Sequence, residues 1–186
     1  MRCISIFSAL IIGVLLCCAC SGSNEQKQKL AEELRMFKEQ AIVLPDNLLA
    51  KYYGEQEPDI SLLDRPIKMV VYVNQGGCED CKLRELFPVY IFTLENKPFT
   101  KFGVVIILNP SHIESVDNFL KEVRFRHTVF YDLDGSFERL NPHLPKNERF
   151  HTFLLDENNN VILVGNPTRN VKLKNLYLSE LRKRHQ

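Results

Sequence analysis

The chain has no apolar run long enough to cross a bilayer as a helix, which needs roughly 20 residues. Its longest largely apolar run, residues 4–16, contains only thirteen. An excess of charge is also missing, because 24 Lys and Arg residues balance 23 Asp and Glu residues. Internal repeats and low-complexity tracts are absent as well. The sequence therefore argues against a repeat array and against nucleic-acid binding, which calls for a basic surface.

The first twenty residues have the order of a bacterial export signal. A positive charge at Arg2 precedes the apolar run, and the run ends in Ala19 and Cys20 before the sequence turns polar. This order resembles the lipobox of bacterial lipoproteins. The resemblance implies that residues 1–19 are a signal peptide, that Cys20 is lipidated, and that a bacterial membrane holds the protein with its domain on the periplasmic or outer side. A plain, cysteine-rich signal peptide is the alternative.

The cysteine count limits the chemistry further. Of six cysteines, maturation would remove or acylate Cys3, Cys17, Cys18 and Cys20. Cys78 and Cys81 remain as thiols. In an oxidising compartment, a disulfide between residues so close in the sequence stabilises a fold very little, because it closes a very short loop. The pair is therefore a candidate for redox chemistry.

The spacing of apolar residues predicts an α/β protein. Residues 25–40 carry apolar side chains at helical spacing. They belong to a tether and N-terminal helical extension over residues 20–65, in which residues 42–66 form a connecting segment that can include a short strand or helix. Strands are predicted at 67–73, 102–108, 127–131, 150–155 and 161–164. Helices are predicted at 78–95 with a kink at Pro88, at 113–123 after a capping box of Ser111 and Glu114, and after the cap Asn170.

The order of these elements defines an architecture. Strands alternate with helices up to residue 131, which implies parallel crossover connections. A β-hairpin with its turn at 156–160 then adds antiparallel strands. We therefore predict a domain at 66–186 with a central mixed β-sheet flanked by helices.

Residues 78–81, with the sequence Cys-Glu-Asp-Cys, follow the first predicted strand and open the next helix. The first-turn N–H groups of a helix lack partners and stabilise a thiolate. Cys78 is nearer the helix start and is the candidate nucleophile. Cys81 lies one turn further and can resolve a mixed disulfide.

The sequence resembles the thioredoxin superfamily, and most closely the TlpA-like envelope thiol–disulfide oxidoreductases. The resemblance covers about residues 66–184 and rests on the stretches 70–81, 130–135 and 151–156. It implies a thioredoxin-like fold, no cofactor, and thiol–disulfide exchange with envelope proteins that carry thiols or disulfides. It also implies that Cys78 and Cys81 are catalytic and that Gly77, His151 and Thr152 are substrate-binding positions.

The chain departs from the family pattern at several places, including Pro88, which comes two residues later than the family's helix proline. Gly77 replaces the usual Trp before the first cysteine, and the chain has no Trp. Glu79 and Asp80 replace the usual Gly-Pro or Pro-Pro. His151 stands at the position of the family's cis-proline, and the buried acid that assists thioredoxin would fall at Tyr72.

The charges around the motif predict the direction of exchange. Negative charge at Glu79 and Asp80 raises the pKa of the Cys78 thiol, and Lys82 and Arg84 oppose only part of that effect. A poorly stabilised thiolate makes the disulfide less oxidising. We therefore predict an exchanger that acts mainly as a reductant or reacts slowly, rather than a strong oxidant.

His151 supports a rival hypothesis. Two thiolates and an imidazole can bind Cu or Zn. The alternative function is therefore a non-catalytic thioredoxin-like module that holds Cu, Zn or a protein partner through Cys78, Cys81 and His151. Covalent haem attachment is not indicated, because Lys82 rather than His follows Cys81.

Overall fold

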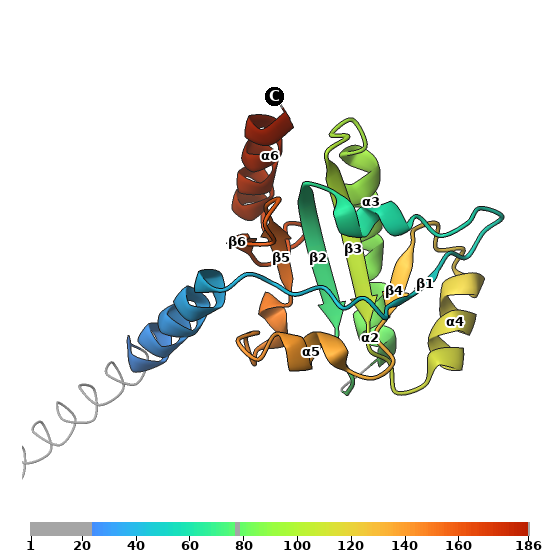
Figure 1. The fold of residues 1–186 in the computed structure, drawn as a ribbon, viewed down its shortest axis with the longest axis horizontal. Helices are drawn as coiled ribbons and strands as arrows, with labels where there is room; N and C mark the ends of the chain where they lie inside the picture. Colours follow the sequence, from blue (N-terminus) through green and yellow to red (C-terminus); the bar gives the residue numbers. More distant parts are fainter. Residues whose placement is uncertain (1–23, 77–78, 186) are drawn as a thin grey trace, which may run out of the picture. The chain divides into compact units, whose positions relative to one another are not determined.

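A computed structural model describes residues 24–76 and 79–185, and it contains a six-stranded mixed β-sheet in the order β1-β4-β3-β2-β5-β6 (Figure 1). The strands are β1 (Leu49–Lys51), β2 (Ile67–Val73), β3 (Phe102–Leu108), β4 (Val129–Tyr131), β5 (Thr152–Leu155) and β6 (Val161–Val164). The α-helices are α2 (Glu79–Arg84), α3 (Leu86–Glu95), α4 (Ile113–Glu122), α5 (Ser136–Leu140) and α6 (Val171–His185), and the 3₁₀ helices are η1 (Ile60–Asp64) and η2 (Glu148–Phe150).

Strands β2, β3 and β4 are parallel and form the centre of the sheet. Strand β5 runs antiparallel to β2, with Thr152 opposite Val71, and β6 runs antiparallel to β5. Strand β1 runs antiparallel to β4 at the other edge. The mixed sheet flanked by helices confirms the predicted fold class.

Both faces of β2 and β3 are buried, which explains why these strands are almost continuously apolar. Met69 and Val71 lie on one face, in a core with buried residues of α2, α3, α4 and α6. Val70 and Tyr72 lie on the other face, in a core with Phe37 and with residues of η1 and α5. The helices thus divide between the two faces of the sheet.

The N-terminal part of the chain contributes more to this unit than expected. Residues 24–39 are helical, close to the predicted 25–40, and the compact unit that contains the sheet begins at Phe37. Strand β1 pairs with β4, and Phe37 and Ile42 are buried in the core. The unit therefore begins well before residue 66, where the sequence pattern placed the start of the domain. No helix in the described part of the chain is both long and apolar enough to span a bilayer.

The helix predicted at 78–95 is divided into α2 and α3, with an interruption at Glu85. Pro88 explains the interruption. It has no N–H to donate to the carbonyl of Arg84, and its ring clashes with that carbonyl in a regular helix. The predicted kink is thus a complete break between two helices.

The helix caps agree with the sequence prediction in one case of two. Asn170 caps α6, because its Oδ1 accepts a hydrogen bond from the N–H of Leu173 at 3.1 Å. The predicted capping box of Ser111 and Glu114 is wrong. Helix α4 begins one residue later than a Ser111 cap requires, and its N-cap is His112, whose side chain makes no capping hydrogen bond within the described residues.

Helix α5 was not predicted, because the sequence after Asp132 was interpreted only as a turn. The buried carboxylate of Asp132 accepts hydrogen bonds from the N–H and hydroxyl of Ser136, both at 2.8 Å, and from the N–H of Phe137 at 3.0 Å. These bonds satisfy donors that the first turn of a helix leaves unpaired. The turn therefore leads directly into a helix that covers one face of the sheet.

Candidate active site

The candidate site lies where the parallel strands end. Strand β2 ends at Val73, a short loop follows, and α2 then carries Cys81. Cys81 is exposed and disulfide-bonded. It is the only cysteine among residues 24–76 and 79–185, and Gly77 and Cys78 lie outside the described residues. The pairing of Cys81 with Cys78 therefore remains a prediction.

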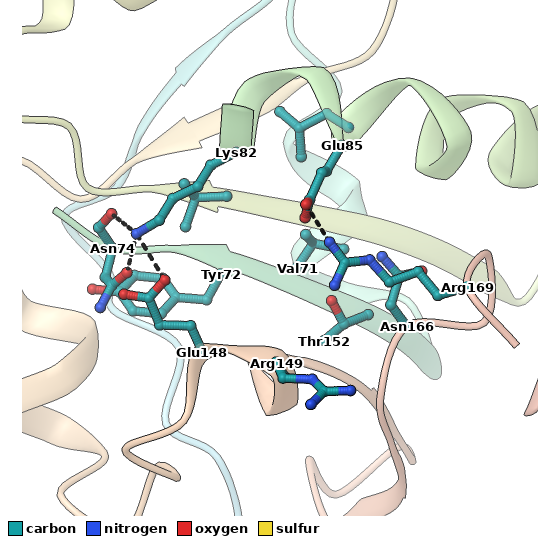
Figure 2. A pocket seen from close by; sticks show the side chains of 12 residues that line it. Val71, Tyr72, Asn74, Lys82, Glu85, Glu148, Arg149, Thr152, Asn166 and Arg169 are labelled. Atoms are coloured by element: carbon teal, nitrogen blue, oxygen red, sulfur yellow. Dashed lines mark hydrogen bonds and ion pairs between the residues drawn. The ribbon is translucent and has the colours of Figure 1, made fainter. Parts of the chain in front are cut away.

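Lys82, next to Cys81, fixes the position of α2. Its ammonium donates hydrogen bonds to the carbonyl oxygen of Asn74 at 3.2 Å and to the side-chain oxygen of Asn74 at 2.9 Å (Figure 2). It also forms an ion pair with Glu148 of η2, with 2.9 Å between Nζ and Oε2. The bond from Lys82 holds the pKa of Glu148 below its usual value. One cation therefore ties α2 to the loop after β2 and to η2.

A cavity of about 230 Å³ lies beside the hydrogen bonds and the ion pair of Lys82. A second ion pair, between Glu85 and Arg169, crosses it (Figure 2). Its wall also includes Thr152, at the start of β5, and Arg149 of η2. The cavity thus combines residues from the helix that carries Cys81 with residues from the loops that precede β5 and α6.

His151 and Thr152, the two predicted substrate-binding residues at the start of β5 that the structure describes, have different surroundings. Thr152 lines the cavity described above. The ring of His151 lines a separate hollow of about 260 Å³ that Asn74 and Pro145 share. The backbone N–H of Tyr72 donates to the carbonyl of His151 at 2.9 Å. His151 and Thr152 therefore both lie near the end of β2, but their side chains line different cavities.

The ring of His151 is held within the protein. Its Nε2 donates to the carbonyl of Pro145 at 2.8 Å, and the ring lies 5.5 Å from the ring of Tyr72. Burial lowers the pKa of His151, so the ring is neutral near pH 7. Its Nδ1 is buried without a hydrogen-bond partner among the described residues. All peptide bonds in the described residues are trans, including the one at this position of the family's cis-proline.

The metal hypothesis needs Cys78, which the structure does not describe. Among the described residues, no group of three His, Cys, Asp or Glu side chains could hold a metal ion. Of the three predicted ligands, Cys81 is engaged in a disulfide and the Nε2 of His151 is hydrogen-bonded. Among the described atoms of these ligands, the Nδ1 of His151 is the one without a hydrogen bond.

Sequence reasoning missed Glu138, which brings a carboxylate to the same edge of the sheet. The hydroxyl of Tyr72 donates to Oε1 of Glu138 at 3.2 Å. Burial, followed by the charge of Glu138, raises the pKa of Tyr72. Glu138 belongs to α5, so it could not be placed without that helix. The spacing of Asp132 and Ser136, which fits a capped helix start, was the available signal.

Similar solved structures have the same fold. A candidate thiol:disulfide interchange protein DsbE from Chlorobium tepidum aligns with a TM-score of 0.53 and 20% identity, covering 76% of this chain and 97% of that one. A candidate thioredoxin from Neisseria meningitidis aligns at 0.52 and 15% identity, covering 78% and 93%. A candidate protein disulfide isomerase from Bacteroides thetaiotaomicron aligns at 0.51 and 16%, covering 77% and 87%.

No family model and no curated protein sequence matches this chain. At these identities the structural similarities establish the fold. The chain therefore has a thioredoxin-like fold, and its activity has to be argued from the site.

Proposed function

We propose that this protein catalyses thiol–disulfide exchange on envelope proteins, with Cys78 as the nucleophile and Cys81 as the resolving thiol. The observation that carries the proposal is the state of Cys81. It is exposed and disulfide-bonded on the helix that follows the central strand of a thioredoxin-like fold. An exposed cysteine in that position supports access by a substrate.

The proposed reaction is a transfer of two electrons. The Cys78 thiolate of the reduced protein attacks one sulfur of a substrate disulfide, forming a mixed disulfide and releasing the first substrate thiolate. The Cys81 thiolate then attacks the sulfur of Cys78 and releases the second. The substrate disulfide becomes two thiols and the protein dithiol becomes a disulfide. An external dithiol must reduce the protein again for turnover.

We also propose that the protein acts mainly as a reductant. Three features oppose a stabilised thiolate at Cys78. Glu79 and Asp80 place two acidic residues in the motif, α2 is only six residues long, and the charge of Lys82 is offset by Glu148. A less stable thiolate lowers the stability of the reduced protein, so the disulfide is a weaker oxidant.

The proposed location is the bacterial envelope, with a lipid on Cys20 and the domain on the periplasmic or outer side. The order of positive start, apolar run, small residue and cysteine in residues 1–20 supports this proposal. Metabolic labelling with an alkyne fatty acid tests it. Label should be incorporated by the natural protein and lost in Cys20→Ser, and equal labelling of the two would refute lipidation at Cys20.

The proposed activity is tested with reduced protein and a disulfide-linked peptide. We expect the natural protein to reduce the peptide, Cys78→Ser to lose at least about a thousandfold in rate, and Cys81→Ser to stop at a mixed disulfide visible by mass spectrometry. Lys172→Met, an exposed change on α6, serves as the control. Reduction at the natural rate by Cys78→Ser would overturn the assignment of the nucleophile.

Titration of the Cys78 thiol tests the direction of exchange. We expect a pKa at or above the free value of about 8.5 and a reduction potential near that of known reductants, about −270 mV. A pKa near that of strongly oxidising proteins, about 3.5, would contradict the proposal.

A further inference from the structure

The charged residues of the cavity beside α2 largely neutralise one another, which leaves a single cation. Lys82 pairs with Glu148, and Glu85 pairs with Arg169. Arg149 also lines the cavity, and its guanidinium makes no ion pair or side-chain hydrogen bond with the side chains that the structure describes, which exclude those of residues 77–80 (Figure 2). The cavity therefore carries one positive charge that no described residue compensates.

Neutral polar groups of the cavity add further donors. The side-chain oxygen of Asn166 already accepts hydrogen bonds from the N–H and hydroxyl of Thr168, at 2.9 and 2.8 Å. Its amide NH₂ has no partner in the described part of the chain, and neither has the hydroxyl of Thr152. Both residues line the cavity. Because the side-chain oxygen of Asn166 is already occupied, the amide offers the cavity a donor.

The unused groups favour one chemical class of ligand. An ionised carboxylate only accepts hydrogen bonds, and it pairs with guanidinium in a planar, two-bond geometry. A protonated amine would be disfavoured, because it would meet hydrogen-bond donors and a positive charge like its own. An apolar group would offer the donors of Thr152 and Asn166 no hydrogen-bond acceptor.

We infer that the cavity lined by Arg149, Thr152 and Asn166 binds an acidic side chain of the protein substrate. This inference rests on the proposed exchange function and specifies its substrate class. Cys78 directly precedes α2 in the chain, and Lys82 of α2 lines the cavity, so a substrate held in a mixed disulfide with Cys78 would have its neighbouring residues close to the cavity. The preferred substrates would then carry Asp or Glu beside the reactive cysteine.

Paired peptides test the inference. Each contains one internal disulfide, and the two differ only by Glu or Gln beside the first cysteine. At low salt we expect reduced full-length protein to react about fivefold faster with the Glu peptide, the ratio expected for an exposed ion pair. Arg149→Gln should bring the ratio to one, and Arg149→Glu should reverse it. Lys97→Gln, which removes an exposed cation outside this cavity, should retain the natural ratio.

A binding experiment separates this inference from the exchange proposal. Both peptides are made with Ser in place of Cys, so that no exchange can occur, and binding is followed by NMR titration. Tighter binding of the Glu peptide, lost in Arg149→Gln and weakened by salt, supports the carboxylate site even if no exchange is observed. Equal affinities for the two serine peptides would overturn it. If the protein reduced neither of the two disulfide peptides nor a small neutral disulfide, that result would count against the exchange function and not against the carboxylate site.

Discussion

Two polar networks in this protein have different consequences for stability and reactivity. At the β1–β4 edge, the carboxylate of Asp117 on α4 accepts bonds from Lys51 at 2.6 Å, from Tyr131 at 2.8 Å and from Tyr53. Around α2, ion pairs such as Lys82 with Glu148 have partners that remain partly open to water. The first network joins three segments through one carboxylate that accepts three hydrogen bonds, whereas the second holds a short helix through separate ion pairs whose acidic members, Glu148 and Glu85, are about half exposed. We therefore expect the first to stabilise the fold and the second to adjust the chemistry.

The largest loss of stability is expected from a substitution at the β1–β4 edge. Burial alone would raise the pKa of Asp117, but hydrogen bonds from Lys51, Tyr53 and Tyr131 outweigh it and lower the pKa. Asp117→Asn removes the charged acceptor, so we expect about 2–3 kcal/mol less stability in urea unfolding. The rate of disulfide exchange by the folded protein should stay unchanged.

The control for this change is Glu95→Gln, which breaks a half-exposed pair with Lys174. It should cost less than about 1 kcal/mol. If both variants lose the same stability, the two kinds of network do not differ as argued.

A pH change acts on both regions, because each has one buried histidine. Burial lowers the pKa of His127, which precedes β4, and of His151 at the site. The unfolded chain binds protons below about pH 6.5 more readily than the folded protein does. Stability should therefore be complete above that pH and decrease as the pH falls through it.

Urea midpoints between pH 7 and pH 5 test the effect. His127→Gln keeps a donor for the carbonyl of Val104 but cannot be protonated. The variant should lose less stability between pH 7 and pH 5 than the natural protein does. An unchanged slope would show that His127 does not contribute to the loss.

The smallest effect on stability is expected around α2. Lys82→Met removes the tie to Asn74 and Glu148, which should cost at most about 1 kcal/mol. It also removes a positive charge next to the motif, so the pKa of Cys78 should rise and exchange at pH 7 should slow by roughly threefold to fivefold. Lys172→Met should change neither quantity. If the Lys82→Met protein lost much stability but exchanged disulfides at the normal rate, the network around α2 would stabilise the fold rather than adjust the chemistry.

The sequence predicted those parts of the fold that depend on local pattern. The continuous apolar strands β2 and β3, the hairpin turn with Asn159 at φ 61°, and the Asn170 cap all follow from residue type and spacing. Strand β1 was not placed, because its three residues have no strong pattern and its pairing depends on β4, about eighty residues later.

The candidate site was only partly predictable, because some of its contacts join segments that are far apart in the sequence. The motif at 78–81 and the position of Thr152 follow from sequence order. The partners of Lys82, by contrast, come from the loop after β2 and from η2, and Arg169 comes from the segment before α6. Ion pairs between distant segments have no local signature, so Glu148 and Arg169 could be assigned to the site only from the structure, as could Arg149, which lines the cavity without an ion pair among the described side chains.

Strand β1 also affects how the protein can be shortened. Its three residues occupy one side of β4, whose other side pairs with β3. A recombinant version that began at residue 66 would leave the backbone N–H and C=O groups of β4 unpaired at an open edge. Unprotected edges of this kind pair with other chains and promote aggregation. A version beginning before Phe37 would retain both this strand and the buried side chains that precede it.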